Sequence, residues 1–243
     1  MDSSSWYDLV AQSVEHLTFN QVVAGSIPAQ ITTLQPIELR MDIPQKINLG
    51  SGKDLQPDYL NIDIDSHWGP DIVLNVSSPF FENGANEFIT RRFGKVTLAP
   101  DSFNEILCKD VLEHVPDLIA TMTNCLTLLK VGGVFNIIVP YDLSYGAWQD
   151  PTHIRAFNER SWLYYTDWFW YLSWSTHRFK MRSLDYLLNP VGEQMQNAGT
   201  AADLILRTPR AVDSMKLVLE KIVLDEEDHK ALQTLKERRA LSR

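Results

Sequence analysis

The sequence predicts an α/β fold built on a mostly parallel sheet. Short apolar runs recur along the chain and alternate with helical or connecting stretches, which is typical of parallel sheets. One run, residues 134–139, is apolar almost throughout, as in strands that are covered on both faces. A glycine turn at Gly50 and Gly52 follows the first apolar run, where glycine lets a backbone approach a ligand closely.

The first half of the chain predicts five strands and two helices. The strands are expected at residues 46–49, 59–64, 71–76, 103–108 and 134–139. A helix is predicted over 115–129, because Pro116 suits its first turn and one face is apolar, formed by Leu118, Met122, Cys125 and Leu129. A short helix is expected near residues 85–93.

The second half begins with an aromatic helix, predicted over residues 161–174. Trp162, Tyr165, Phe169 and Leu172 would form one stripe, and Tyr164, Trp168 and Tyr171 another. This helix would serve as an aromatic wall over a ligand, as a core helix with a homodimer interface, or as both. Two more strands are expected at 179–187 and 202–206, followed by charged helices over 212–241.

Composition narrows the classes of function. With 243 residues the chain is long enough for one well-buried domain and short for two. The net charge of -9 argues against a protein that coats nucleic acid or an anionic membrane. Cys108 and Cys125 lie in apolar segments and are expected to be core residues. No apolar stretch is long enough to span a bilayer, and no secretory signal is recognised, so we expect a cytoplasmic protein.

The N-terminus reads differently from the rest of the chain. Residues 1–38 resemble a spurious translation of a transfer-RNA gene, most clearly at residues 22–29. The alternative is an amphipathic helix with Leu9, Val10, Ser13, Val14 and Leu17 on one side. We expect residues 1–40 to be an extension that is disordered or not native, with Met41 as the natural start.

The glycine turn and Asp63 together indicate a nucleotide-like ligand. A carboxylate at the end of a second strand can accept hydrogen bonds from both ribose hydroxyls. About ten residues separate Gly52 from Asp63, whereas the dinucleotide fingerprint has its acidic residue ≈ 20 residues downstream. A parallel crossover this short leaves no room for a full helix. Dinucleotide binding, and with it a nucleotide-dependent oxidoreductase, is therefore disfavoured.

Three further segments resemble class I S-adenosylmethionine-dependent methyltransferases. They are residues 101–106, the run around Leu112, Glu113 and His114, and residues 129–134, in which Val131 stands where proline is usual. The resemblance covers roughly residues 46–139, with a weaker echo at 150–157. It implies a single Rossmann-like three-layer sandwich, with a mostly parallel seven-stranded sheet and an antiparallel edge. It also implies a methyltransferase domain over 41–210, a helical extension over 211–243, and S-adenosylmethionine as cofactor.

The resemblance assigns cofactor roles to particular residues. Gly50, Ser51 and Gly52 would line the methionine end, Asp63 would hold the ribose, and Asn75 and Val76 would meet the adenine. Lys109 and Asp110 would face the reacting methyl group. The expected cofactor-binding residues are Asn48, Gly50, Ser51, Gly52, Asp63, Ile64, Asn75, Val76, Lys109 and Asp110.

His114, His153 and Asp150 are the predicted catalytic residues. They follow the fourth and fifth strands, at the edge where open α/β sheets bind ligands. His153 would act as base with Asp150 orienting its imidazole, and His114 is the second candidate. The alternatives are that His114 anchors the following helix, His153 bonds a loop carbonyl and Asp150 caps a turn. No ligand spacing indicates a metal, and none is expected.

The predicted function is methylation of a small molecule or sugar moiety, most simply on oxygen. The main rival is a methyltransferase-like protein that is catalytically inactive and acts as a binding or scaffold protein. A nucleic-acid methyltransferase is disfavoured by the acidic charge and by the lack of an Asn-Pro-Pro-Tyr-type motif.

Overall fold

The computed structural model describes residues 43–78 and 86–241. Residues Arg40–Arg243 form one compact unit. The predicted N-terminal extension and its resemblance to a transfer-RNA gene lie outside the described residues. None of the helices in the described ranges combines the length and apolar content that a bilayer crossing requires.

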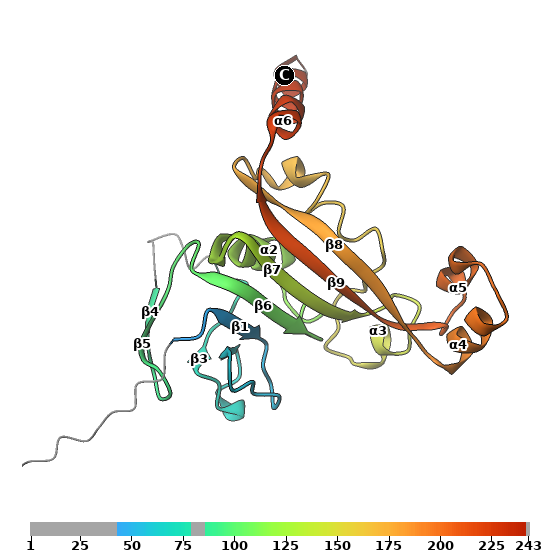
Figure 1. The fold of residues 1–243 in the computed structure, drawn as a ribbon, viewed down its shortest axis with the longest axis horizontal. Coiled ribbons are helices and arrows are strands. Elements are labelled where there is room, and N and C mark those ends of the chain that lie inside the picture. The colour runs from blue at the N-terminus through green and yellow to red at the C-terminus, as the bar shows by residue number, and fades with distance from the viewer. Residues whose placement is uncertain (1–42, 79–85, 242–243) are drawn as a thin grey trace, which may run out of the picture. The chain divides into compact units, whose positions relative to one another are not determined.

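One mixed sheet organises the unit (Figure 1). Within the described residues its seven strands run in the order β3-β2-β1-β6-β7-β9-β8. Their bounds are β1 Lys46–Leu49, β2 Leu60–Asp63, β3 Ile72–Val73, β6 Phe103–Lys109, β7 Leu129–Pro140, β8 His177–Leu188 and β9 Val212–Val223. In this order the first five strands, β3, β2, β1, β6 and β7, pair in parallel with their neighbours. Strand β9 is antiparallel to both β7 and β8. The predicted mostly parallel, seven-stranded sheet is confirmed, with its antiparallel strand second from the edge.

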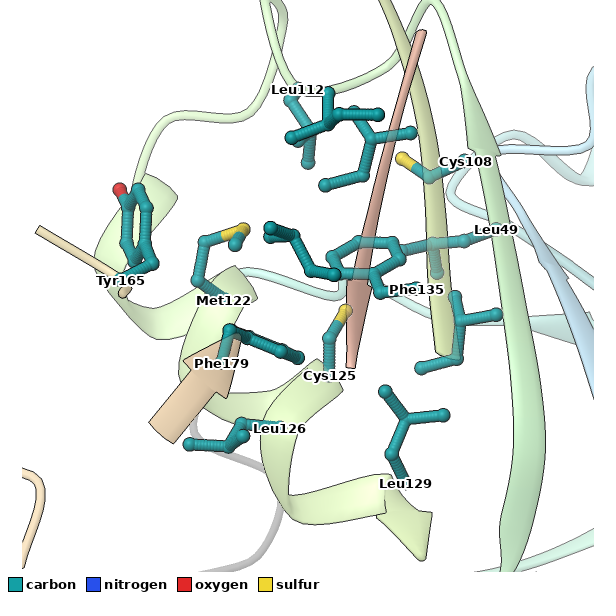
Figure 2. Close-up of a cluster of buried hydrophobic side chains, with 14 of the residues drawn as sticks. Leu49, Cys108, Leu112, Met122, Cys125, Leu126, Leu129, Phe135, Tyr165 and Phe179 are labelled. Atoms are coloured by element: carbon teal, nitrogen blue, oxygen red, sulfur yellow. The ribbon is translucent and has the colours of Figure 1, made fainter. Parts of the chain in front are cut away.

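Helix α2, Leu118–Leu128, covers one face of this sheet as predicted. Asp117 begins it, because its carboxylate accepts a hydrogen bond from the Ala120 amide. Figure 2 shows Met122 and Cys125 of α2 facing Cys108 and Phe135 of the sheet. Both cysteines are buried and free, as expected of core residues.

The connection from β1 to β2 is a loop without a helix, as the short spacing predicts. Buried Asn48 holds it, since its side-chain amide donates to the Asp54 carbonyl at 2.9 Å and to Asn61 Oδ1 at 3.0 Å. The next connection contains one short 3-10 turn, η1, Ser66–Trp68. The chain therefore returns quickly to the same sheet edge.

The helix predicted near residues 85–93 is wrong. In the described part of this stretch, β4 (Asn86–Thr90) and β5 (Gly94–Leu98) form an antiparallel hairpin. Gly94 has a φ of 67°, which suits the turn, and the Thr90 hydroxyl donates to the Gly94 carbonyl. β-Branched residues on both sides of the turn favour strands over a helix.

The aromatic helix predicted over 161–174 is also wrong. The segment is a series of turns with one short 3-10 helix, η2, Phe169–Leu172. In the first predicted stripe Trp162, Tyr165 and Phe169 are buried and Leu172 is half-buried, whereas Tyr164, Trp168 and Tyr171 of the second stripe are exposed. Trp162 stacks on Phe157, with ring centroids 5.3 Å apart. Tertiary packing of the rings, which the helical pattern does not include, sets this backbone.

The C-terminal expectations need two corrections. Residues 202–206, predicted as a strand, lie in helix α5 (Ala202–Arg207), which follows α4 (Pro190–Asn197). The predicted helices over 212–241 are wrong in their first part, because β9 occupies Val212–Val223, and right in α6 (Glu226–Leu241). In β9, Met215, Leu217 and Leu219 alternate with more exposed residues, which is the period of a strand. The stretch expected as a helical extension over 211–243 thus supplies a strand of the sheet.

Asp71 and Arg92 tie the β4–β5 hairpin to the β2–β3 connection. The Arg92 guanidinium donates to both carboxylate oxygens of Asp71, at 2.7 and 2.6 Å. Burial alone would raise the pKa of Asp71, but hydrogen bonds from Arg92 and the Asn61 amide outweigh it and lower the pKa. The ionised form is therefore stabilised in the folded protein.

We expect Asp71→Asn to lower the free energy of unfolding by about 1.5–3 kcal/mol at neutral pH, because charge-assisted hydrogen bonds are lost. A carboxylate with a lowered folded-state pKa stabilises above its ordinary value of 3.8, and this contribution disappears as the pH falls through the folded value. Urea denaturation should therefore show that the difference in the free energy of unfolding between the variant and the wild type decreases at acidic pH. Asp203→Asn, which removes an exposed pair with Arg207, is the control and should change stability by less than about 0.5 kcal/mol. Equal effects of the two changes would contradict the prediction.

Candidate functional site

A pocket of about 350 Å³ lies where β1, β2 and β6 end. Because these strands are parallel, their carboxyl ends meet at one edge of the sheet (Figure 1). Open α/β sheets bind their ligands at this edge. The predicted position of the site is thus where the structure has a cavity of ligand size.

The glycine turn after β1 forms one wall. Gly50 has a φ of 64°, and a Cβ there would lie 2.3 Å from a methyl carbon of Val111. The Gly50 and Ser51 amides both donate to the Ile62 carbonyl, which fixes the turn against β2. Gly52, with a φ of 47°, has open space where a Cβ would stand. Glycine is therefore needed at 50 for close packing and at 52 for the backbone conformation.

Asp63 ends β2 beside this turn. Its Oδ2 accepts a hydrogen bond from the Gly52 amide at 2.7 Å, and its Oδ1 accepts one from the Asp65 amide at 2.9 Å. Each carboxylate oxygen keeps a further lone pair, and the side chain lines the pocket. Asp63 can thus accept hydrogen bonds from two neighbouring hydroxyls of a ligand.

The structure separates the ten predicted cofactor residues into two sets. Seven line the pocket: Gly50, Gly52, Asp63, Ile64, Asn75, Val76 and Asp110. Asn48, Ser51 and Lys109 do not. The Asn48 side chain is hydrogen-bonded within the β1–β2 loop, Ser51 is buried, and Lys109 is exposed at the end of β6.

Several lining residues were missed by sequence reasoning. They are Ile62, Trp68, Leu74, Ser77, Val111, Val115 and Pro116. Trp68 had a usable signal, since it is an aromatic residue in the turn that follows the acidic strand end. Residues 161–174, the predicted aromatic wall, are absent from the lining of this pocket.

Two predicted catalytic residues are linked through Thr152. The Asp150 carboxylate accepts the Thr152 hydroxyl at 2.7 Å, and this bond lowers the pKa of Asp150. The Thr152 Oγ1 lies 2.9 Å from Nδ1 of His114. Because the one hydroxyl hydrogen points to Asp150, Oγ1 must accept from Nδ1–H. Neutral His114 then carries its free lone pair on Nε2.

His153 is held in the same tautomer by a different partner. Its Nδ1 lies 3.2 Å from the Ala147 carbonyl, which can only accept a hydrogen bond. Nε2 is again left with the lone pair. The two imidazoles meet edge to face with centroids 4.5 Å apart. The predicted pairing of Asp150 with His153 is therefore wrong, because Asp150 orients His114 through Thr152.

Glu113 lies beneath the two histidines and was not predicted as a site residue. It is 1% exposed, and within the described residues neither carboxylate oxygen has a hydrogen-bond partner from another residue. Burial raises the pKa of Glu113 to about 7. A carboxylate oxygen of Glu113 and one ring nitrogen each of His114 and His153 lie within 4.8 Å of one another. These are donor types that can hold a metal ion.

Asp110, at the end of β6, has a left-handed backbone with a φ of 53°. Such conformations are rare outside glycine and gather at functional sites. The side chain lines the pocket, and burial raises its pKa. Asp110 therefore shares the lining of one pocket with the glycine turn and His114.

Arg155 joins the two loops that carry the histidines. Its guanidinium donates to the carbonyls of Leu112, Val115 and Pro116, in the turn after β6. The Ile154 amide donates to the Glu113 carbonyl beside it. The loop after β7 is thereby fixed on the turn after β6, which explains how His153 reaches His114.

We expect Arg155→Lys to lower the free energy of unfolding by about 1–3 kcal/mol. A lysine ammonium cannot present the planar fork that satisfies three carbonyls, and a buried carbonyl without a partner is destabilising. Guanidinium denaturation measures the change. Arg160→Lys is the matched control, because Arg160 is exposed and should tolerate the change within about 0.5 kcal/mol. If Arg155→Lys were as stable as the wild type, the three hydrogen bonds of the Arg155 guanidinium would contribute nothing to stability.

Comparisons with known proteins add similarity of fold. No family model and no curated protein matches the chain. Among solved structures, a SAM-dependent methyltransferase from Archaeoglobus fulgidus is 12% identical, with 74% of this chain and 86% of that chain covered and a TM-score of 0.46. The YcgJ protein from Bacillus subtilis is 14% identical (76% and 94% covered, TM-score 0.42), and the [4+2]-cyclase SpnF is 11% identical (74% and 75% covered, TM-score 0.44). At such values the similarities decide nothing about activity, which depends on the site itself.

Proposed function

We propose that this chain is an S-adenosylmethionine-dependent methyltransferase that methylates a small molecule or sugar moiety on oxygen. The observation that carries the proposal is the position of Asp63 in the pocket. Its carboxylate lies beside a tight glycine turn at the carboxyl edge of a parallel sheet. This arrangement suits a ribose held next to a closely approached backbone.

The pocket residues fit the parts of this cofactor. The cavity of about 350 Å³ has apolar walls from Ile64, Leu74 and Val76, with Trp68 beside them, which suit a planar base. Asn75 adds a polar group at that end. Gly50 and Gly52 border the other end, where Asp110 supplies a negative charge close to where a cationic sulfur would lie.

When bound, the cofactor supplies a methyl group on a cationic sulfur: the carbon–sulfur bond breaks with its electron pair staying on sulfur, and the acceptor oxygen forms the new bond to carbon. The chain's own contribution is to align the two reactants and exclude water. An acceptor hydroxyl must also lose its proton. Nε2 of His114, which lines the pocket, or of the adjacent His153 can accept this proton.

The acceptor side supports a sugar or a planar molecule. The loop that carries His153 includes the short helix α3, Gly146–Gln149, and exposes Tyr145 and Trp148. Exposed aromatic rings next to a catalytic pair can stack on an acceptor ring. These two residues replace the segment over 161–174 as the proposed aromatic contact.

The exposed cluster of Tyr164, Trp168 and Tyr171 remains the proposed homodimer surface. Its rings pack against one another: the centroid of the Tyr164 ring lies 5.3 Å from the ring centroids of both Trp168 and Tyr171. Aromatic residues are enriched in protein interfaces. A cytoplasmic location stays a prediction from the sequence, in which no secretory signal and no membrane-spanning stretch is recognised, and the lack of nucleic-acid and membrane partners stays a prediction from its acidic charge.

Calorimetric titration tests cofactor binding directly. We expect the wild type to bind S-adenosylmethionine and Asp63→Asn to bind it about 10–100-fold more weakly, because losing hydrogen bonds to a charged group costs about 1.5–3 kcal/mol. Asp58→Asn, an exposed change in the same loop region, is the control and should keep the wild-type affinity. Unchanged affinity in Asp63→Asn would remove Asp63 from the site. No binding to the wild type would favour the inactive, scaffold-type alternative.

Turnover tests the histidines once a screen with labelled cofactor has found an acceptor. We expect His114→Ala and His153→Ala each to lower turnover by about 10²–10⁴. His153 is absent from the pocket lining, so its loss should leave cofactor affinity unchanged, whereas His114 lines the pocket and should affect both. His229→Ala, on exposed α6, should behave as the wild type. Full turnover in His153→Ala would exclude it from the reaction.

A further inference from the structure

We propose that Glu113, His114 and His153 bind one divalent transition-metal ion, and that this ion holds the acceptor oxygen. The binding of the ion stands on the three side chains alone. Its role toward an acceptor rests on the proposed function: with both Nε2 lone pairs bound to the ion, the ion takes the place of the histidines as base, by lowering the pKa of the bound acceptor hydroxyl so that its proton passes to solvent. The sequence spacing did not indicate a metal, because His153 is brought to the other two by the fold.

The three side chains converge from two loops. Glu113 and His114 lie in the turn after β6, and His153 lies in the loop after β7. Their ligand atoms lie within 4.8 Å of one another, so small side-chain rotations bring all three to one ion. Arg155 fixes the two loops together through three backbone carbonyls, which makes the arrangement a property of the backbone.

The hydrogen bonds of both imidazoles fix the tautomer that a metal ligand needs. A metal-binding histidine usually donates its other ring N–H to a carbonyl or to a carboxylate-linked group, which sets the tautomer. His153 does so to the Ala147 carbonyl, and His114 does so to Thr152, which is itself bonded to Asp150. In both rings Nδ1 is taken up by this bond, which leaves Nε2 as the ligand atom, and the ring centroids lie 4.5 Å apart.

Glu113 supplies a second, independent observation, which is a buried carboxyl group without a partner. A carboxyl group that is 1% exposed is normally paired, yet neither of its oxygens has a partner from another described residue. Leaving a buried carboxylate unpaired is strongly unfavourable. A cation at this point satisfies its charge and both imidazole lone pairs together.

The donor set indicates the kind of ion. Two imidazole nitrogens and one carboxylate oxygen suit Zn²⁺ and similar transition metals, whereas Mg²⁺ and Ca²⁺ favour oxygen ligands. Three protein ligands leave a coordination position free, as in catalytic sites. Because His114 lines the pocket, that position can be reached by an acceptor oxygen next to the cofactor.

Metal binding by the full chain tests the proposal. After treatment with a chelator, the protein is dialysed against ZnCl₂, and bound metal is measured by mass spectrometry. We expect one Zn²⁺ per chain, and Co²⁺ in its place should give visible absorption bands with imidazole character. Glu113→Gln, which keeps the side-chain shape, and His153→Ala should each weaken Zn²⁺ binding by about 100-fold or more. Thr152→Val, which removes only the partner of His114, should weaken it by about 10–100-fold.

Controls separate this site from the proposed function. His177→Ala, in β8, should bind Zn²⁺ like the wild type. Near-ultraviolet circular dichroism and retained cofactor binding show that Glu113→Gln is folded. Equal Zn²⁺ binding by the wild type and Glu113→Gln, or no binding by the wild type, would overturn the metal site even if the cofactor binds. Zn²⁺ binding without cofactor binding would uphold the metal site and contradict the proposed function.

Discussion

The site depends on one guanidinium group. Arg155 donates to three carbonyls of a turn that belongs to a different part of the chain, so the loop after β7 is joined to the turn after β6. His114 and His153 meet because of this bond set, since no strand or helix contains both. An arginine is suited to it, because its planar fork offers several fixed donors where a lysine offers a point charge. Loops that carry function are commonly positioned in this way by a scaffold.

The cofactor side depends on a different constraint, which is the closeness of two backbones. Val111 leaves no room for a side chain at position 50, and the left-handed Asp110 turns the chain directly after β6. Asp63 then fastens the end of β2 to Gly52. Gly50, Gly52 and Asp110, which all have a left-handed backbone, therefore line the same pocket. The residues that allow the two backbones to pack closely therefore also line the pocket that a ligand would enter.

The sequence predicts well what is encoded locally. The buried strands, the capped helix α2 and the glycine turn with Asp63 each have a short pattern of their own, and the structure has them in place. What it could not predict depends on contacts that a local pattern does not contain. Trp162 stacks on Phe157 instead of extending a helix, and residues 202–207 form a helix where apolar residues suggested a strand. Glu113 was not predicted as a site residue, because a glutamate stands out only when the structure shows that its carboxyl group is buried. The pairing of Asp150 likewise required the position of Thr152, which spacing does not give.

The position of β9 has a consequence for how the protein comes to be folded. Among the strands of the described residues it is the last in sequence, yet it lies between β7 and β8, and β8 joins the sheet through it. During synthesis β7 therefore presents an open edge until a strand that starts about 70 residues later has left the ribosome. An open edge can pair with another chain. The half of the sheet that holds the pocket can assemble first from β1, β2 and β6, while the other half waits until β9 has been synthesised.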